Sequence, residues 1–422
     1  MTIFFENLGM NESDPLSHSY HFTTGEMNLA INLSQRVNAV KPSATLAITA
    51  KAKALKAEGK NIIGLGAGEP DFDTPEHIKQ AAIKAINDGL TKYTAVPGTA
   101  ELKQAICDKF KRDNQLDYTP EQVLVSSGGK QSFYNLCQAL LNPGDEVLIP
   151  APYWVSYPDM VILADAKPVI IESGLEQNFK ITVEQLLAHI TDKTRLLVLN
   201  SPSNPTGVCY TEAELKALGT VLQDYPEIII ASDDMYEHIL WAEESYKTMA
   251  QVCPELYSRV VTLNGVSKAY SMTGWRIGYA AGPKELIGAM TKIQSQSTSN
   301  ACSISQAAAL EALNGDQSCI QEMLVEFKKR HDYIVSALND IPGMKAIESQ
   351  GAFYSFPNVE SLIEQIEGVN NDVELSAYIL EKAEVALVPG SAFGAPGYIR
   401  LSFATSMENL QESIARLKKL FS

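Results

Sequence analysis

Short apolar runs and longer helical stretches alternate along this chain between residues 122 and 281. Consecutive apolar residues over five or six positions are typical of strands that are buried on both faces of a sheet. The predicted strands are residues 123–127, 145–149, 167–172, 195–200, 226–231, 259–263 and 277–281. Strands that alternate with helices predict an α/β fold with a mostly parallel central sheet.

Further helical and strand patterns flank this region. Residues 46–58 have helical apolar spacing and end at Gly59, and residues 75–87 begin with Pro75, which is favoured in a first helical turn. We expect helices at 283–314, interrupted around 295–303, and at 322–338. Strands are expected at 351–356, 385–390 and 398–403. The chain of 422 residues therefore predicts two domains. These are a large domain at 73–314 and a smaller α+β domain made of 29–72 plus 315–422.

Composition narrows the class of protein. The chain is 45% hydrophobic and 20% charged, and it has no uncharged apolar run long enough to cross a bilayer. A net charge of −16 argues against a nucleic-acid partner. Six cysteines without metal-ligand spacing predict reduced thiols and no metal site, and they favour a cytoplasmic protein.

The first 28 residues differ from the rest. They include Glu6, Glu12, Asp14 and Glu26 but no Lys or Arg, so they fit neither a secretory signal nor a transit peptide. Polar residues dominate them, and we expect this N-terminal extension to be disordered. Met27 is a candidate for the true start of the protein.

One lysine lies where a predicted strand ends. Lys268 and Arg276 both fall between the strands at 259–263 and 277–281. Ligands of α/β proteins bind at the carboxyl ends of strands. A lysine that lies there among small residues and near another cation can have a lowered pKa and react with a carbonyl group. An isolated loop lysine is more commonly a solvated surface residue, so the neighbouring motifs must decide between a reactive and a solvated lysine.

A glycine turn predicts a phosphate site. Gly128 and Gly129 open a helix, and the free N–H groups of a helix N-terminus suit an anion. The turn is neither a dinucleotide fingerprint nor a Walker motif, which favours a smaller phosphate-bearing cofactor. Lys130 lies in the first turn, where a cation is electrostatically unfavourable. That conflict indicates a functional demand.

Other polar residues end or interrupt apolar strands. Asp233 follows a run of buried isoleucines, and a carboxylate there requires a cation. Trp154 follows the strand at 145–149 and offers a flat π face, although it could be simple core. Asn204 belongs to a rigid Asn-Pro-Thr-Gly turn. Arg400 interrupts an apolar strand and requires an anion, either a ligand or a structural ion-pair partner.

The segment Ser267-Lys268, with Met272-Thr-Gly-Trp-Arg-Ile-Gly278, resembles the lysine segment of class I aminotransferases that use pyridoxal 5′-phosphate (PLP). The resemblance covers most of the chain and is closest to a bacterial aspartate aminotransferase subgroup that includes enzymes acting on prephenate. It implies the PLP-dependent transferase fold of type I. It also implies amino-acid and keto-acid substrates and a homodimer with shared active sites.

The resemblance implies roles for individual residues. Lys268 would hold the cofactor covalently and act as the catalytic base, Asp233 would pair with its ring nitrogen, and Trp154 would stack on the ring. Asn204 and Tyr236 would contact its phenolic oxygen. The cofactor's phosphate would be bound by Gly128, Gly129, Lys130, Ser267, Arg276 and, from the partner subunit, Tyr93.

For the substrate, the resemblance implies that Arg400 and Gly68 contact the α-carboxylate, beside Trp154 and Asn204. Lys130 would pair with a distal carboxylate. Substrate choice would also rest on the stretch from Lys41 to Thr45, in which Lys41 would bear on the use of prephenate. This predicts transfer between aspartate and 2-oxoglutarate by ping-pong kinetics, with prephenate as a possible second substrate.

The chain departs from the family pattern at two positions. Gly265 occurs where many relatives have Ser, which leaves the phosphate more dependent on Arg276. Asp234 occurs where Glu is usual.

Two other classes of function compete with this interpretation. A PLP-dependent β-lyase or a broad aromatic or alanine aminotransferase would share most of the motifs, and only Lys130 and the N-terminal segment argue against them. A transcription regulator would need a DNA-binding domain, for which the first 28 residues are too few and lack basic residues.

Overall fold

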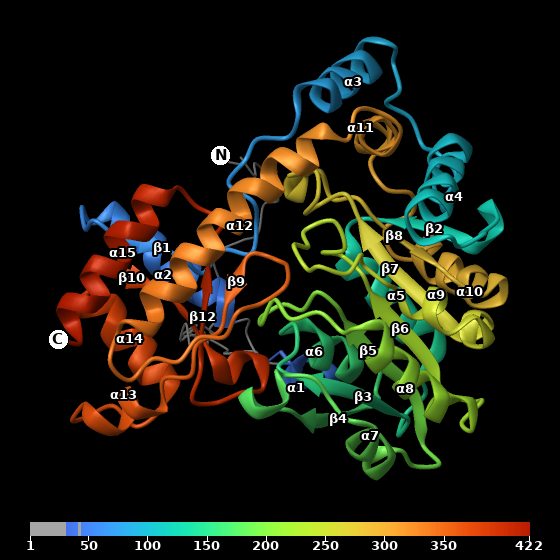
Figure 1. Cartoon of the computed structure of the whole chain (residues 1–422). Coiled ribbons are helices and arrows are strands. Elements are labelled where there is room, and N and C mark those ends of the chain that lie inside the picture. Colours follow the sequence, from blue (N-terminus) through green and yellow to red (C-terminus); the bar gives the residue numbers. More distant parts are fainter. Residues whose placement is uncertain (1–30, 41–43) are drawn as a thin grey trace, which may run out of the picture.

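The computed structural model describes residues 31–40 and 44–422, so the disorder predicted for residues 1–28 lies outside the described residues. A seven-stranded sheet forms its centre, in the order β2-β8-β7-β6-β5-β3-β4 (Figure 1). Only β8 runs antiparallel to its neighbours, so the predicted mostly parallel sheet is confirmed. Its strands are β2 (Val123–Ser126), β3 (Glu146–Ala151), β4 (Lys167–Glu172), β5 (Thr194–Asn200), β6 (Ile229–Asp233), β7 (Val260–Gly265) and β8 (Gly278–Ala281).

Both faces of this sheet are buried, because successive side chains of a strand point to opposite faces. Along β5, Leu196 and Val198 pack into one core, whereas Leu197 and Leu199 pack into the other. The first core is covered by α5 (Gly129–Leu140), α6 (Ser156–Ile162) and α10 (Lys284–Ser295). The second is covered by α4 (Ala100–Asn114), α7 (Val183–His189), α8 (Glu212–Gln223), α9 (Met249–Val252) and α11 (Ser303–Asn314). Burial on both faces explains why the strands are apolar runs without alternation.

A third core, separate from the two that cover the large sheet, gathers residues from both ends of the chain. Here β1 (Ile63–Gly64) pairs with β10 (Val385–Ala386), and β9 (Tyr354–Ser355), β12 (Ile399–Ser402) and β11 (Val388–Pro389) form an antiparallel sheet. The helices here are α2 (Ala44–Ala57), α12 (Ser318–Asn339), α13 (Glu360–Gln365), α14 (Asp372–Lys382) and α15 (Met407–Leu420). The domain boundaries expected from the sequence stay a prediction.

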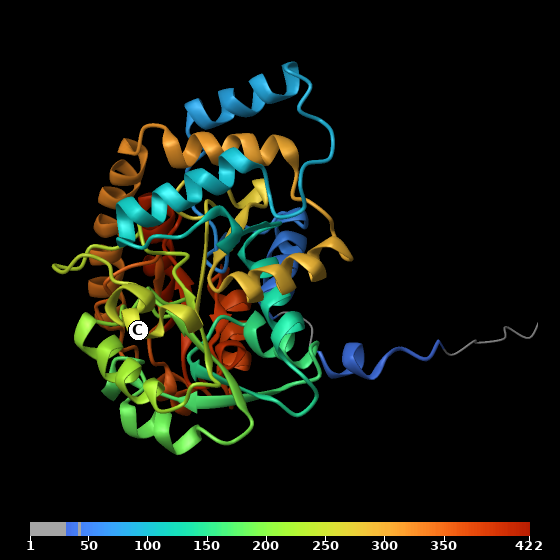
Figure 2. The same cartoon turned by 90° about the vertical axis from the view of Figure 1, so that its right-hand side faces the viewer.

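Two further helices lie at the edge of the molecule. Figures 1 and 2 show α3 (Glu76–Asn87) beside α11, away from the sheet. The short α1 (Gln35–Ala39) has no buried residue. Among the described residues, no helix has both the length and the apolar character needed to cross a membrane.

Two of the predicted strands differ from the structure in their bounds or in their pairing. The strand expected at 385–390 is two strands, β10 and β11, because it joins β1 first and then β12. The strand expected at 226–231 is shifted to β6, so Asp233 is itself the last paired residue, opposite Asn200 and Leu263. The helix expected at 283–314 is interrupted as predicted, into α10 and α11.

Close backbone contact at one glycine holds the sheet against α5. A Cβ atom on Gly278 would lie 2.8 Å from Gly129 Cα and 2.5 Å from Gly128 C, and these are backbone atoms that cannot rotate away. Gly278 is therefore required so that β8 can approach the turn before α5.

We expect Gly278→Ala to destabilise the protein by about 1–3 kcal/mol, because the added methyl group forces the α5 turn away from the sheet. The measurement is the urea midpoint of the cofactor-free protein. Gly288→Ala is the matched control, since Gly288 lies on α10 with open space around its Cα and should be neutral or slightly stabilising. Equal midpoints for both variants would contradict this account of Gly278.

Candidate active site

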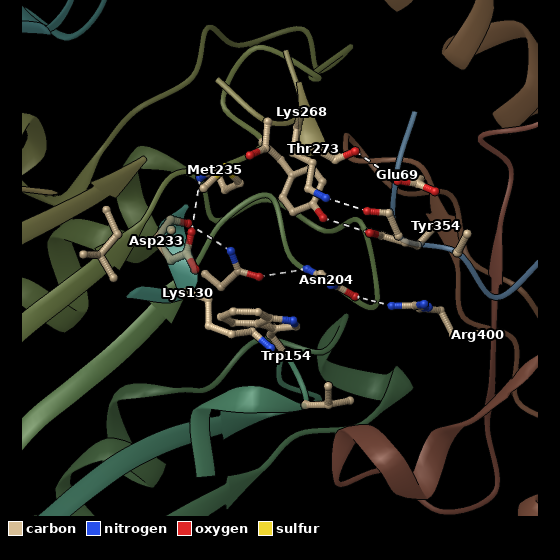
Figure 3. A pocket seen from close by; sticks show the side chains of 18 of the residues that line it. Glu69, Lys130, Trp154, Asn204, Asp233, Met235, Lys268, Thr273, Tyr354 and Arg400 are labelled. Atoms are coloured by element: carbon tan, nitrogen blue, oxygen red, sulfur yellow. Dashed lines mark hydrogen bonds between the residues drawn. The ribbon is translucent and has the colours of Figure 1, made fainter. Parts of the chain in front are cut away.

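A cavity of about 470 Å³ opens at the carboxyl ends of the central strands, between the large sheet and strands β9 and β12 (Figure 3). This is the edge at which α/β proteins bind ligands. The predicted site residues that line it are Gly68, Gly129, Lys130, Trp154, Asn204, Asp233, Tyr236, Ser267, Lys268, Arg276 and Arg400. Segments more than 330 residues apart in sequence, such as Gly68 and Arg400, therefore meet in one cavity.

Lys268 follows β7 and points into this cavity. Its Nζ donates a hydrogen bond to the carbonyl oxygen of Gly68. Burial, with the neighbouring Arg400 and Arg276, lowers the pKa of Lys268 to about 8, against the opposing charges of the Glu69 and Asp233 carboxylates. A lysine with such a pKa has a substantial neutral fraction near neutrality, and the neutral amine is the nucleophilic form.

Asp233 ends β6 as a buried carboxylate. It accepts hydrogen bonds from the Tyr157 hydroxyl and from the backbone N–H of Met235. Burial raises the pKa of Asp233, while these donors and Lys268 act in the opposite direction. The remaining cost of an ionised carboxylate here would be met by a cation that enters the cavity.

The N-terminus of α5 forms one wall of the cavity together with Arg276. Gly128 has φ 88° and precedes the first helical residue. The Arg276 guanidinium donates to Thr273 O at 2.9 Å and to Ser127 O at 3.4 Å, which places it beside the glycine turn. Arg276 itself has φ 56°, a conformation that non-glycine residues seldom adopt and that marks functional sites.

Lys130 lies beside Trp154, with Nζ 5.1 Å from the ring centroid (Figure 3). Partial burial and the charge of Arg276 lower the pKa of Lys130. Its ammonium group therefore stands near a second cation, an arrangement that an anionic ligand would stabilise.

Arg400 lies on the opposite side of the cavity, on β12, and is 3% exposed. Its guanidinium donates to Asn204 Oδ1 at 2.9 Å and to Gly66 O at 2.7 Å, and it lies 4.5 Å above the Tyr354 ring. Its buried Nε finds no hydrogen-bond partner within the described part of the chain. No carboxylate pairs with it there either, so the structural ion pair considered as an alternative is not formed among these residues.

The donor set fits the cofactor that the sequence resemblance implies. A buried carboxylate that requires a cation, a lysine of lowered pKa, a flat indole and a glycine cradle with an arginine all face one space. A Cβ atom on Gly128 would collide with the Arg276 guanidinium and would be strained at its positive φ, so a side chain there would displace the arginine. These are the groups that a flat, phosphate-bearing pyridine ring would contact.

Four of the predicted site residues are not among those lining the cavity. Gly128 lies next to it, behind Arg276. Tyr93 is 92% exposed on the surface. Lys41 lies outside the described residues. Thr45 belongs to α2, and its side chain also lies outside the description.

Sequence reasoning missed several residues of the site. Tyr157 contacts Asp233, Tyr354 accepts or donates a hydrogen bond at 2.8 Å with Tyr236, and Glu69 and Thr273 line the cavity together. Glu69 directly follows the predicted loop glycine Gly68, and that position was a usable signal. Tyr157 and Tyr354 carried no signal in the sequence because they lie within apolar and aromatic runs.

Asp113, Glu237 and His238 are the one group of potential metal ligands found in residues 31–40 and 44–422. Glu237 is already paired with the buried Lys109 and accepts from Asn114 and Asn264. These contacts explain the cluster as a buried network of ion pairs and hydrogen bonds.

Comparisons with known proteins identify the family of this chain. The family model "Aminotransferase class I and II" matches residues 60–417. An aspartate/prephenate aminotransferase of Nitrosomonas europaea is 60% identical over 93% of this chain and all of its own length. An aspartate aminotransferase of Bacillus subtilis is 50% identical over 92% of this chain and 98% of its own.

Solved structures show the same fold. The aspartate aminotransferase from Rhizobium meliloti has a TM-score of 0.89 at 48% identity, covering 92% of this chain and 98% of its own. The aspartate aminotransferase from Thermus thermophilus with maleate has a TM-score of 0.86 at 43% identity, covering 92% of this chain and 100% of its own. The chain therefore belongs to the class I and II aminotransferases, a family of PLP-dependent enzymes that act on amino and keto acids.

Proposed function

We propose that this protein is an aspartate aminotransferase that exchanges an amino group between L-aspartate and 2-oxoglutarate with bound PLP. The observation that carries the proposal is the pair of cations, Arg400 and Lys130, on opposite sides of the cavity that also holds Lys268. Two cations suit a substrate with two carboxylates. The names of the relatives and the maleate, a dicarboxylate, in the Thermus thermophilus structure support the same substrate class.

In this proposal the cofactor would be held through four kinds of contact. Lys268 would bind it covalently, and the Asp233 carboxylate would pair with its ring nitrogen while Tyr157 keeps the carboxylate in place. Its phosphate would be bound by the turn at Gly128–Gly129, by Ser267 and by Arg276. Its ring and its oxygen would be contacted by Trp154, Asn204 and Tyr236. When bound, PLP supplies a conjugated ring that takes up the electron pair left by the substrate's α-proton.

The side chains of the chain would then position the substrate and move one proton. The Arg400 guanidinium binds the α-carboxylate in a fork, assisted by Asn204 Oδ1, which already orients it. Lys130 binds the distal carboxylate. Lys268, whose pKa is about 8, is suited to take the α-proton as a general base near neutral pH.

We expect Lys130→Met to lower kcat/KM for L-aspartate by roughly 10- to 150-fold, equivalent to about 1.5–3 kcal/mol for a hydrogen bond to a charged group. Methionine retains an apolar chain beside Trp154. The matched control is L-alanine, which has no distal carboxylate and should be affected less than about threefold. Steady-state kinetics with 2-oxoglutarate as acceptor measures both, and an equal loss for the two amino acids would contradict the role of Lys130.

Prephenate is proposed as a second keto-acid substrate, supported by the names of relatives that are 53–60% identical. The purified protein is expected to transfer the amino group of glutamate to prephenate at a rate within about tenfold of its rate with oxaloacetate. Chromatographic detection of the amino-acid product measures this transfer. Activity with oxaloacetate alone would leave the aspartate reaction intact and exclude the second activity.

A homodimer with shared active sites is also part of the proposal. Tyr93 is 92% exposed, and apolar side chains of α3 and the following loop, Ile83, Ile86 and Leu90, are exposed near it in sequence. Aromatic and apolar residues left open in this way are typical of an interface. In the proposed dimer, Tyr93 reaches the phosphate of the partner's cofactor.

We expect Tyr93→Phe to weaken PLP binding by several-fold, since one hydroxyl donor is lost, while sedimentation shows an unchanged dimer. Titration of the cofactor-free protein with PLP measures the affinity. Tyr398→Phe is the control, because Tyr398 packs on Phe356 outside the cavity. A monomer in sedimentation would contradict the shared site, and an unchanged affinity would contradict the role of Tyr93.

A further inference from the structure

The loop after β1 contacts two of the cations in the cavity, Arg400 and Lys268. Gly66 O accepts from Arg400 Nη2 at 2.7 Å, and Gly68 O accepts from Lys268 Nζ. The loop cannot easily carry a larger residue at its centre, since a Cβ atom on Gly68 would lie 2.9 Å from the Tyr354 hydroxyl oxygen. Its position is therefore linked to the positions of both cations.

Glu69 extends this contact to the proposed phosphate ligand. Its Oε2 accepts from Thr273 Oγ1 at 3.0 Å, and Thr273 O accepts from Arg276 Nη1 at 2.9 Å. Figure 3 shows Glu69 and Thr273 side by side near Lys268. Thr74 binds the same segment farther along, by donating to Ser271 O at 2.7 Å. The loop and the lysine segment are thus joined at several points, and Glu69 contacts the residue whose backbone oxygen accepts from Arg276.

The negative charge of Glu69 also contributes to the balance of charges in the cavity. The other charged or titratable side chains of the cavity are Lys130, Asp233, Tyr236, Arg276, Tyr354 and Arg400. Four cations, counting Lys268, thus face two carboxylates, and Asp233 is the one that the cofactor's ring nitrogen would take. Burial and the two arginines lower the pKa of Lys268, whereas the charge of Glu69 raises it.

We propose that Glu69 is a positioning residue with two separable actions: its charge offsets the cations around Lys268, and its hydrogen bond holds Thr273 and, through it, the Arg276 guanidinium. This inference rests on the roles given to Lys268 and Arg276 in the proposed function. Glu69 itself needs no contact with the reacting atoms. The two actions can be separated by two variants. Glu69→Gln removes the charge but keeps an acceptor oxygen for Thr273, whereas Thr273→Val removes the hydrogen bond but keeps the charge of Glu69.

The first measurement follows Lys268 in the cofactor-free protein. Pyridoxal, which lacks the phosphate, is added over a range of pH and the absorbance change is timed. The neutral amine forms a C=N double bond with the aldehyde carbon and the oxygen leaves as water, so the rate rises as Lys268 loses its proton. Lys268→Ala supplies the blank for reaction at other lysines.

Glu69→Gln is expected to move the midpoint of this profile down by about half a pH unit or more, because loss of a nearby anion lowers the pKa of an ammonium group. Thr273→Val should leave the midpoint within about 0.2 units of wild type, and so should Glu364→Gln, a carboxylate on α13 that is exposed outside the cavity. An unchanged midpoint in Glu69→Gln would overturn the charge action.

The second measurement titrates the same cofactor-free proteins with inorganic phosphate in a calorimeter. Thr273→Val should bind phosphate several-fold more weakly. The variant loses the hydrogen bond to Glu69, so the backbone oxygen that accepts from Arg276 is no longer held in place. Glu69→Gln should bind it as tightly as wild type or more tightly, because an anion near the site is gone. Equal affinity in Thr273→Val and wild type would overturn the hydrogen-bond action.

Neither measurement depends on turnover, so failure of this inference differs from failure of the proposed function. If wild type reacted with pyridoxal no faster than Lys268→Ala, the role of Lys268 would be wrong, and the inference would be wrong with it. If wild type shows a clear pH midpoint and the Glu69 and Thr273 variants match it in both measurements, only the role of Glu69 is overturned.

Discussion

The site depends above all on a carboxylate placed in the interior of the protein. Asp233 is 9% exposed at the end of β6, and burial alone disfavours its charged form. The Tyr157 hydroxyl and the Met235 N–H stabilise that charge only in part. The buried carboxylate therefore favours a cation in the cavity, and a protonated pyridine ring would be such a cation.

Close packing of backbone makes room for such a ligand and aims the surrounding groups. Gly278 lets β8 touch the turn before α5, and Gly128 leaves space for Arg276 at that turn. The helix N-terminus and a guanidinium then share one wall of the cavity. The opposite wall comes from the small sheet, where Arg400 is held by Asn204 and by the loop carbonyl of Gly66. The cavity therefore lies between the large sheet and the small sheet, and residues of both line it.

Four cations near one another would be unstable without anions, and this requirement links the proposed roles. Asp233 and Glu69 are the carboxylates that line the cavity, and both raise the pKa of Lys268 against burial and the two arginines. The remaining positive charge suits a phosphate and two substrate carboxylates. The net charge of the chain is −16, so attraction of such anions is a local property of the cavity.

The sequence by itself determined the α/β class, the parallel strands and most of the cavity residues, because buried strands are apolar runs and ligand groups follow their carboxyl ends. It also indicated Asp233 and Arg400 by charges that conflict with their apolar strands, and Lys268 by its place after a strand beside motifs that resemble a known family. Only the tertiary structure decided the partners of these groups. Tyr157 contacts Asp233 across 76 residues of sequence and Glu69 contacts Thr273 across 204, and no local sequence pattern records contacts at such separations.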